Sequence, residues 1–407
     1  MGPASEIASQ VRTGRLSAAV VIEEALDRAE SAQAELNAYT LIDKQRAIDR
    51  ARHIDATVAG GADPGPLAGV PIGLKDLIDQ AGLPNTRGSS FAAQQPSRSA
   101  EVVHRLEHAG GVIIGRTGLH EFAFGFSSEN PWFGAVRNPW DLETSPGGSS
   151  GGSAATVAAG TVPIAIGTDT GGSVRVPAAL CGILGLKVTH GRVPLSGVFP
   201  LAASLDTVGP FARSVDDLAT TYLAIAGDHP ADPWSWPVPV EAPGKLDDPS
   251  QVRIGVVRQW FASLHTREIA ADIESFIERC SHLGMDMVEI DEDSLRPIDA
   301  ATKASRAEIL DVHDDMFQND PERYGDDLQR RLKASYDVTL QDLVVARRWQ
   351  AAARATVQRL TNDGITAFLA PTVGVMRKEI GRDMVDIDGT EIFYRDPLAN
   401  FTSPINA

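Results

Sequence analysis

The stretch SPGGSSGGSAATVAAGTVPIAIGTDTGGS, residues 145–173, is the most informative part of this chain. It holds two glycine-flanked serine clusters, centred on Ser149 and Ser173. The small residues between them predict a helix from about Gly152 to Ala159, and the apolar run that follows predicts a strand over 162–168. A helix, a buried strand and a glycine-rich turn in this order are typical of an α/β protein.

The flanking sequence continues this alternation. The apolar run GVPIGL at 69–74 predicts a buried strand that ends directly before Lys75. Other elements expected up to residue 226 are a helix at 99–109, a strand at 112–115, a short helix after Ser173, a strand near 183–189 and a helix capped by Ser214. Beyond residue 252 we expect a strand at 253–258, a helix at 268–283, a strand at 285–290, helices over 300–361 and a strand at 365–371 that returns to the sheet. The sequence therefore predicts an α/β fold with a mixed, mainly parallel central sheet flanked by helices.

Charge and composition exclude several function classes. The 407 residues include 37 basic and 54 acidic side chains, for a formal charge of −17. Such a surface repels phosphate backbones, so we expect no direct nucleic-acid binding. Two cysteines, Cys181 and Cys280, cannot form a disulfide scaffold and suit a reducing compartment. We find no signal-peptide pattern and no apolar run of membrane-spanning length, so we expect no membrane association and a cytoplasmic location.

Ser173 is the first candidate for chemistry. It lies in TDTGGSVRVPAAL, after the apolar strand and before a short helix. Two preceding glycines let the backbone turn, so that several N–H groups can point at one spot. The N–H groups of Thr170, Gly171, Gly172 and Ser173 are then predicted to form an oxyanion hole beside the hydroxyl. An ordinary glycine-rich turn capped by serine remains an alternative.

Ser149 and Lys75 are the second and third candidates. The glycines of GGSSGG allow unusual backbone geometry at Ser149, although a flexible linker would have the same composition. Burial at the end of a strand would lower the pKa of Lys75 and produce the neutral amine that a base requires. Because a carboxylate beside it would oppose this shift, we expect Asp76 to point away. A solvated lysine at a strand end is the alternative.

Together these segments resemble the amidase signature family. The matching phrases are GVPIGLKD, SPGGSSGGSAA, GTDTGGSVRVPAALCGILGLKVTHGRV and SLDTVGPFARSVDDLA. The resemblance implies that Ser173 is the acylated nucleophile, Ser149 a bridging serine and Lys75 the terminal base. It also implies a cis peptide bond at Gly148–Ser149.

The same resemblance implies the activity and the supporting residues. It predicts hydrolysis of a carboxamide C–N bond in linear amides, not peptides, through an acyl-enzyme. Neither a metal nor another cofactor is expected, and the expected partner is a small-molecule amide, with a homodimer left open. Ser150, Asp169 and Arg175 match family positions that support the site. For Asp169 and Arg175, a simple surface pair is the alternative.

The resemblance also implies that residues 1–407 form a single amidase signature domain. We expect a helical N-terminal segment at 1–62, a catalytic core at 63–226, a proline-rich linker or lid at 227–251, and further sheet and helices at 252–407. Family members continue past the phrase FTSPINA, where this sequence stops. The resemblance therefore leaves open whether the C-terminus is truncated.

Several other interpretations stay open. Within the family, the chain could be the A subunit of a tRNA-dependent glutamine amidotransferase. From another class, it could be a truncated, non-catalytic protein that binds ligands or partners. The pattern Gly147-x-Ser149-x-Gly151 fits a nucleophile elbow but lacks a preceding strand. His104-x-x-Glu107-His108 fits an inverted zinc motif, yet the segment is better explained as an amphipathic helix with solvated histidines.

Aromatic residues near the site hint at the pocket. An apolar or aromatic acyl pocket would be built from nearby rings, although core packing explains the same residues. The candidates are Phe122, Phe124, Phe126, Trp132 and Phe133.

Overall fold

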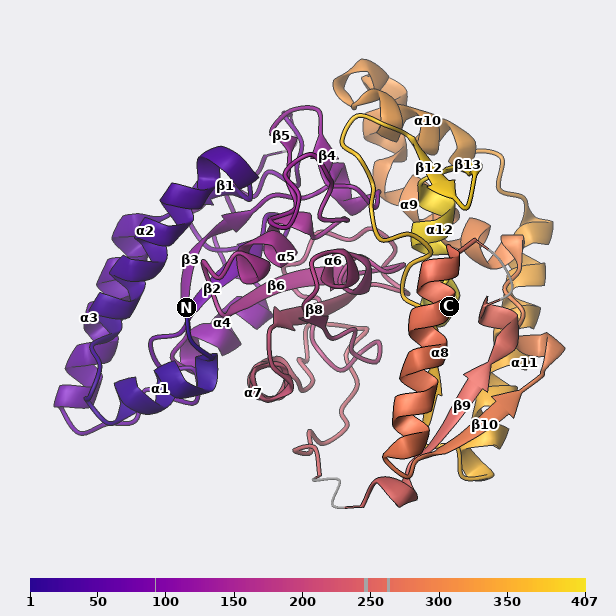
Figure 1. Ribbon diagram of the computed structural model, residues 1–407. Helices are drawn as coiled ribbons and strands as arrows, with labels where there is room; N and C mark the ends of the chain where they lie inside the picture. The colour runs from indigo at the N-terminus through magenta and orange to yellow at the C-terminus, as the bar shows by residue number, and fades with distance from the viewer. Residues whose placement is uncertain (92, 245–247, 262–263) are drawn as a thin grey trace.

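A six-stranded mixed sheet lies at the centre of the molecule (Figure 1). The computed structural model describes residues 1–407 except 92, 245–247 and 262–263. The strand order is β1-β3-β2-β6-β8-β7. The strands are β1 (Tyr39–Ile42), β2 (Pro71–Lys75), β3 (Val112–Thr117), β6 (Ile164–Asp169), β7 (Leu184–Gly185) and β8 (Thr207–Ala212). The predicted α/β class with a mixed central sheet is confirmed.

The parallel pairings lie in the middle of this sheet. Strand β2 pairs in parallel with both β3 and β6, whereas β1, β8 and β7 add antiparallel edges. Because β2 and β6 are parallel neighbours, their carboxyl ends meet at one edge of the sheet. That edge carries Lys75 at the end of β2 and Asp169 at the end of β6.

Two strands, the edge strand β7 and its neighbour β8, differ from the sequence prediction. The strand expected near 183–189 is only Leu184–Gly185, and the rest of that segment is a loop. Strand β8 was not predicted, because Gly209 and Pro210 interrupt its apolar residues and both are poor strand formers. Pairing with β6 along its whole length holds β8 in place.

Helices cover the sheet as predicted. Helix α3 packs on β3, α5 on β6 and β2, and α7 on β8. Ser214 caps α7, and its Oγ accepts a hydrogen bond from the Asp217 N–H at 3.1 Å. The predicted helical segment 1–62 also contains strand β1. These helices are α1 (Ala4–Arg12), α2 (Ala18–Leu36), α3 (Lys44–Ala59), α4 (Glu101–His108), α5 (Gly151–Ala158), α6 (Arg175–Leu180) and α7 (Val215–Ile225).

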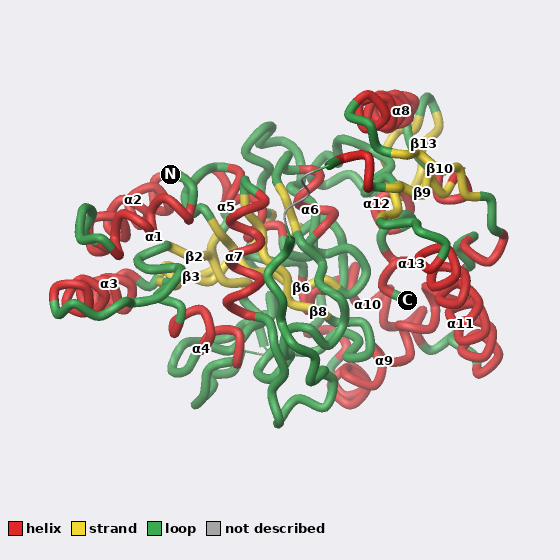
Figure 2. Tube along the Cα trace, turned by 90° about the horizontal axis from the view of Figure 1, so that it is seen from below, coloured by secondary structure: helices red, strands yellow, loops and turns green. Residues whose placement is uncertain are grey.

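The C-terminal third forms its own layer beside the main sheet (Figures 1 and 2). Its parallel sheet has the order β10-β9-β11, with β9 (Arg253–Val257), β10 (Asp286–Ile290) and β11 (Ala367–Leu369). The expectation that the segment at 365–371 rejoins the main sheet was therefore wrong. These strands bury a separate apolar cluster that includes Val257, Ile290 and Leu360, so they do not need the main sheet to cover them.

The remaining elements are helices, hairpins and short 3-10 helices, most of them in the C-terminal third. Its helices are α8 (Arg267–His282), α9 (Asp299–Asn319), α10 (Asp326–Ser335), α11 (Leu340–Asn362), α12 (Arg395–Ala399) and α13 (Ser403–Asn406). Two hairpins are built from β4 (Glu129–Asn130) with β5 (Gly134–Ala135) and from β12 (Met384–Ile387) with β13 (Thr390–Phe393). Short 3-10 helices occur at Glu121–Ala123, Pro249–Gln251, Arg258–Phe261, Asp293–Leu295 and Pro321–Arg323.

The proline-rich segment 227–251 connects the two layers. The ring of Trp234 packs against His190, with centroids 5.5 Å apart, and the Trp236 N–H donates to the Gly191 carbonyl at 2.9 Å. Its described part therefore packs on the loop that follows β7. Whether the segment acts as a lid stays a prediction.

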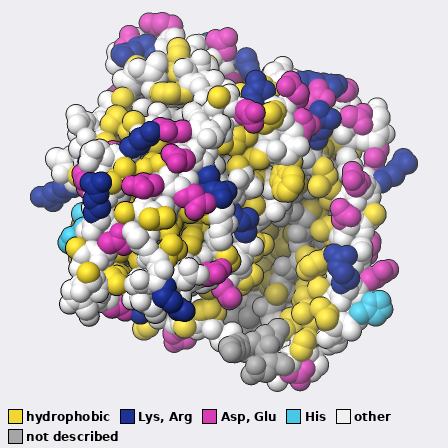
Figure 3. Space-filling view, turned by 60° about the vertical axis from the view of Figure 1, so that its left-hand side comes forward, with side chains coloured by type: hydrophobic (Ala, Val, Ile, Leu, Met, Phe, Trp, Pro, Cys, Tyr) yellow, Lys and Arg dark blue, Asp and Glu magenta, His cyan; other side chains and the backbone are white. Residues whose placement is uncertain are grey.

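The surface is mixed in charge. Figure 3 shows acidic and basic side chains interspersed across one face, with hydrophobic atoms between them. Among the residues that the structure describes, no helix has both the length and the apolar character needed to cross a bilayer. Cys181 and Cys280 are both buried and unpaired.

Candidate active site

Lys75 lies at the centre of the site. It ends β2 and is fully buried. Its Nζ donates to the Oγ of Ser149 and to the Oγ1 of Thr168, each at 2.8 Å. Burial lowers the pKa of Lys75 to about 7, against the opposing pull of the Asp169 and Asp206 carboxylates. A substantial fraction of this amine is therefore neutral near pH 7.

Asp76 points away from this amine, as expected. Its carboxylate accepts hydrogen bonds from the Arg116 Nε at 3.1 Å and from the Thr40 Oγ1 at 2.8 Å. The Asp76 and Arg116 side chains are both about 1% exposed. Because adjacent residues of a strand face opposite sides, the Asp76 charge is neutralised elsewhere and does not oppose the pKa shift of Lys75.

Ser149 is held in a packed loop before α5. The Gly148–Ser149 peptide bond is cis, as the resemblance implied. The Ser149 carbonyl accepts from the His120 N–H at 3.1 Å, and a Cβ atom added at Gly148 would lie 2.8 Å from the Ser127 nitrogen. GGSSGG is thus a buried, tightly packed segment, and the flexible-linker alternative was wrong.

Ser173 lies between β6 and α6 and is 4% exposed. Its carbonyl accepts a hydrogen bond from the Ser150 N–H at 3.3 Å, so the two serine loops are neighbours. Ser173, Thr170 and Gly171 line one side of a narrow cavity of about 50 Å³. The structure therefore brings the three predicted relay residues to one edge of the sheet, with Ser173 facing a pocket.

One of the four predicted oxyanion donors is already engaged. The Gly172 N–H donates to the Asp169 Oδ1 at 2.8 Å, so that part of the prediction was wrong. The turn aims this amide at the buried carboxylate beneath the loop, where an unpaired charge would be costly. Thr170, Gly171 and Ser173 remain as candidate donors.

Asp169 and Arg175 form a buried pair, and the surface-pair alternative was wrong. The Arg175 Nε and Nη2 donate to the two Asp169 oxygens at 3.0 and 2.8 Å. The Asp169 side chain is fully buried, and that of Arg175 is 15% exposed. Although burial raises the pKa of Asp169, the charge and hydrogen bonds of Arg175 outweigh it and hold that pKa well below its usual range. The pair anchors both ends of the Ser173 turn.

Ser150 and Thr168 join the two loops. The Ser150 Oγ donates to the Thr168 carbonyl at 3.1 Å, consistent with the predicted supporting role of Ser150. Thr168, which sequence reasoning missed, places its Oγ1 on Lys75. The alternation of β6 was its only signal, because it turns Thr168 to the lysine side and Asp169 to the arginine side.

Residues 402–406 at the C-terminus also contact the site, and no local sequence pattern predicted this. The Thr402 Oγ1 and the Ser403 Oγ both donate to the Gly171 carbonyl, at 2.7 and 2.9 Å. The Asn406 Nδ2 donates to the Asp169 Oδ1 at 3.0 Å. The segment around α13 therefore fixes the back of the Ser173 turn from 231 residues away.

The predicted aromatic pocket is correct in part. Phe124 and Phe126 line the cavity at Ser173. Phe122 instead packs in the core against Tyr324, with ring centroids 5.5 Å apart. Trp132 and Phe133 are 40% and 37% exposed.

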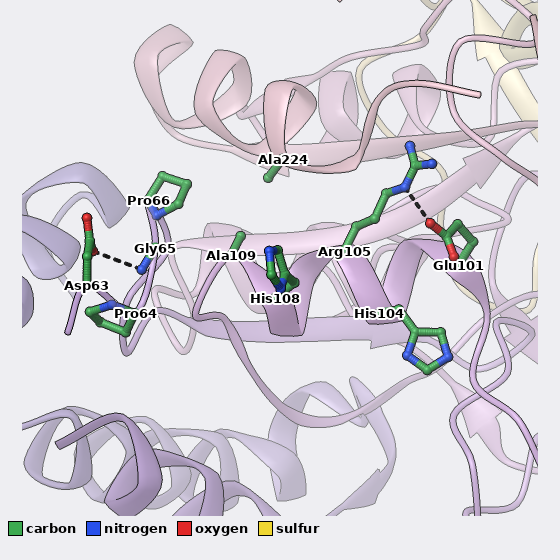
Figure 4. A pocket seen from close by; sticks show the side chains of 10 residues that line it. All are labelled: Asp63, Pro64, Gly65, Pro66, Glu101, His104, Arg105, His108, Ala109 and Ala224. Atoms are coloured by element: carbon green, nitrogen blue, oxygen red, sulfur yellow. Dashed lines mark hydrogen bonds and ion pairs between the residues drawn. The ribbon is translucent and has the colours of Figure 1, made fainter. Parts of the chain in front are cut away.

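The competing motifs find no support in the described residues. Figure 4 shows His104 and His108 on α4, beside an open pocket of about 800 Å³ that shares no lining residue with the Ser173 cavity. No group of three His, Cys, Asp or Glu side chains within the described chain is placed to hold a metal ion. Gly147-x-Ser149-x-Gly151 follows a turn, not a strand, so it is not a nucleophile elbow.

The chain is similar to known proteins along most of its length. The amidase family model matches residues 20–406. The A subunit of the glutamyl-tRNA(Gln) amidotransferase of Carboxydothermus hydrogenoformans is 42% identical over 292 residues, which cover 70% of this chain and 60% of that protein. The chain thus spans about 60% of the length of the curated relatives it matches.

Solved structures extend the likeness over the whole chain. One, described as a vestigial protein complex that reveals the evolutionary origins of an s-triazine catabolic enzyme, has a TM-score of 0.91 at 32% identity and covers 100% of this chain and 89% of its own. A bacterial aryl acylamidase of the amidase signature family has a TM-score of 0.84 at 26% identity, covering 100% of this chain and 87% of its own. The family model and these structures together show that the chain belongs to the amidase signature family.

Proposed function

We propose that this chain is an amide hydrolase that cleaves a carboxamide C–N bond through an acyl-enzyme on Ser173. The observation that carries the proposal is the buried Lys75 amine, with a pKa of about 7 and a 2.8 Å hydrogen bond to Ser149. A base of this kind is half neutral near pH 7, where it can take a proton from a hydroxyl. Neither a metal nor a histidine is needed in this scheme.

The relay runs in two half-reactions. Neutral Lys75 takes a proton from Ser149 while Ser149 takes one from Ser173, and the Ser173 oxygen attacks the amide carbonyl carbon. When the C–N bond breaks, the relay returns a proton to the departing nitrogen. Water then loses a proton to the same relay and attacks the ester, and Ser173 recovers its hydrogen as the carboxylic acid leaves. Each cycle consumes one amide and one water.

The turn around Ser173 supplies the electrostatic part of the proposal. The N–H groups of Thr170, Gly171 and Ser173 would receive the negative oxygen of the tetrahedral intermediate. Thr402 and Ser403 hold the Gly171 carbonyl. Since the Asp169–Arg175 pair also ties down the turn, the donors are fixed before the substrate arrives, which lowers the cost of reorganisation.

Ammonia release from a panel of aryl, aliphatic and amino-acid amides tests this function. We expect turnover of at least one class by the wild-type protein and none by Ser173→Ala. A fluorophosphonate probe should label the wild-type protein at Ser173. Unlabelled, folded wild-type protein that hydrolyses no amide would contradict the proposal and favour the non-catalytic alternative.

A second candidate is the A subunit of a tRNA-dependent amidotransferase. Relatives with that name at about 42% identity favour it. In that case the ammonia released from glutamine would pass to a partner protein that contacts the tRNA. Expression with a tagged chain tests it. Co-purification of a tRNA-binding partner together with glutamine-dependent ammonia release would support this candidate, and activity of the chain alone on other amides would oppose it.

A further inference from the structure

A half-buried cation lies in the pocket at Ser173, and the relay does not use it. Arg395 begins α12 and lines the same cavity as Ser173, Thr170 and Gly171. Its guanidinium lies over two rings of the pocket wall, 5.3 Å from the centroid of Phe124 and 5.7 Å from that of Phe126. The rest of the wall is mostly apolar, with Leu201, Leu205 and Ile309 among its residues.

The charge of Arg395 has no counter-ion in the described part of the chain. No carboxylate lies within ion-pair distance of its guanidinium there, and the described pocket lining contains no acidic side chain. The terminal residue Ala407 also lines the pocket, but its carboxyl oxygen accepts a hydrogen bond from Arg354 at 2.9 Å. Asp327, whose charge acts on Arg395 and opposes the lowering of its pKa by burial, already accepts a 2.8 Å bond from Arg331. Contact with aromatic faces compensates a buried cation only in part.

Two neighbouring arginines, Arg331 and Arg306, repel the charge of Arg395 and so favour the binding of an anion beside it. Burial, together with repulsion from Arg331 and Arg306, lowers the pKa of Arg395 to about 9. Arg306 belongs to α9, the helix that contributes Thr302, Ser305 and Ile309 to the pocket wall. An anion placed here would relieve this repulsion and would meet the planar donor set that guanidinium offers to carboxylates.

We propose that Arg395 binds a carboxylate on the acyl part of the substrate, so that the preferred substrates are monoamides of dicarboxylic acids. The inference rests on the proposed function, because it takes the pocket at Ser173 as the acyl site. The acyl group is transferred to Ser173 in the first half-reaction and leaves it as the acid in the second, so a cation in the same pocket would hold it in both steps. The small cavity of about 50 Å³, with Arg395 as the one cation in its described lining, fits a small acyl chain with one terminal charge.

Matched amides test the preference. We would compare kcat/KM for succinamate, glutaramate and adipamate with that for the neutral diamides succinamide, glutaramide and adipamide. We expect at least one anionic amide to exceed its diamide by about 10- to 100-fold, the range of a charge-assisted hydrogen-bonded pair. Arg395→Gln should remove that advantage, mainly through the KM of the anionic amide, so that the ratio of the two kcat/KM values falls to about 1. Arg395→Lys should restore part of it.

Controls separate this inference from the activity itself. Arg348→Gln, at an exposed position of α11, should leave the ratio unchanged. Retained labelling of Ser173 by a fluorophosphonate would show that Arg395→Gln is folded. Calorimetry on Ser173→Ala measures binding without turnover: glutaramate should bind more tightly than glutaramide, and Arg395→Gln should abolish the difference.

The outcomes are distinguishable. Hydrolysis of diamides with no anionic preference at any of the three chain lengths would overturn the inference and leave the proposed function standing. Selective binding of glutaramate without any hydrolysis would support the binding role of Arg395 and overturn the proposed function. A preference confined to N-butyrylglycine over N-propylbutyramide, where the carboxylate is on the amine side, would overturn the acyl-side assignment.

Discussion

The Nζ of Lys75 lies 2.8 Å from the Oγ of Ser149, and both side chains are completely buried. The two residues are 74 positions apart in the chain, one at the end of a strand and the other in the loop before a helix. Burial lowers the pKa of the amine to about 7, so the hydrogen bond joins a hydroxyl to a base that is active near neutral pH. This contact leads to the predictions below.

Ser173→Ala should reduce amide hydrolysis by several orders of magnitude, because the proposed covalent intermediate cannot form. The measurement is ammonia release under saturating substrate. Ser31→Ala, at an exposed position on α2, controls for the loss of a hydroxyl. Wild-type turnover in the Ser173 variant would end the assignment of the nucleophile.

The dependence of kcat/KM on pH should follow the deprotonation of Lys75. If neutral Lys75 is the base, kcat/KM rises with pH through a midpoint near 7 and then levels off. Single-turnover measurements across about pH 5 to 10 would test this, with chemistry limiting. A rate that does not change between about pH 6 and 9 would contradict the role of the lysine.

Lys75→Met should stabilise the fold more at acid than at alkaline pH. The folded pKa of about 7 lies below the ordinary value of 10.5, so the unfolded chain binds more protons between these values and wild-type stability rises with pH there. We therefore expect the gain in unfolding free energy of the variant to be about 3 kcal/mol larger at pH 6 than at pH 9. Urea unfolding at both pH values measures it, with Lys303→Met on the surface of α9 as the control for charge removal. An equal gain at both pH values would mean that the amine titrates normally.

Thr168→Val should move the pH profile to lower pH. The Thr168 hydroxyl accepts a hydrogen bond from Lys75, which favours the charged amine, so its loss lowers the pKa of that amine further. The measured quantity is the midpoint of the kcat/KM profile. Thr156→Val provides a match, since Thr156 is also buried but donates to the Ser153 carbonyl instead. A midpoint that moves up, or moves equally in both variants, would contradict this.

Arg175→Met should destabilise the fold by about 3–5 kcal/mol, because it leaves the buried Asp169 carboxylate without its partner. The depressed pKa of Asp169 contributes stability above the carboxyl group's ordinary pKa and loses it as pH falls, so the deficit should shrink in acid. Denaturant unfolding at pH 7 and at about pH 3, below the ordinary carboxyl pKa, would measure it. Arg98→Met, at an exposed position, is the control.

Sequence patterns predicted the elements whose residues all face one environment. The strands β2, β3 and β6 are buried along their whole length and begin with apolar runs, and each was expected within a few residues of its observed bounds. Strand β8 escaped because a central glycine and proline mask it, and only pairing with β6 reveals it. The separation of β9, β10 and β11 into a second sheet was likewise invisible, since periodicity indicates a strand but not its neighbours.

For the site, too, the sequence revealed some features and only the structure revealed the others. Local sequence was enough to show which residues could do the chemistry, because a lysine after a buried strand and two serines among glycines are local features, and their resemblance to a known family assigns them roles. The structure was needed to show that the Gly172 N–H donates a hydrogen bond to Asp169 and that the Thr168 hydroxyl accepts one from Lys75. It was also needed to show that side chains of residues 402–406 form hydrogen bonds with the turn around Ser173 and with Asp169. Arg395 in the pocket belongs to the second group. The Asp169–Gly172 bond lies within one turn, but the other contacts join segments that the chain brings together only when the sheet has formed. Hydrogen bonds and burial act over a few ångströms in space, whatever the distance in sequence.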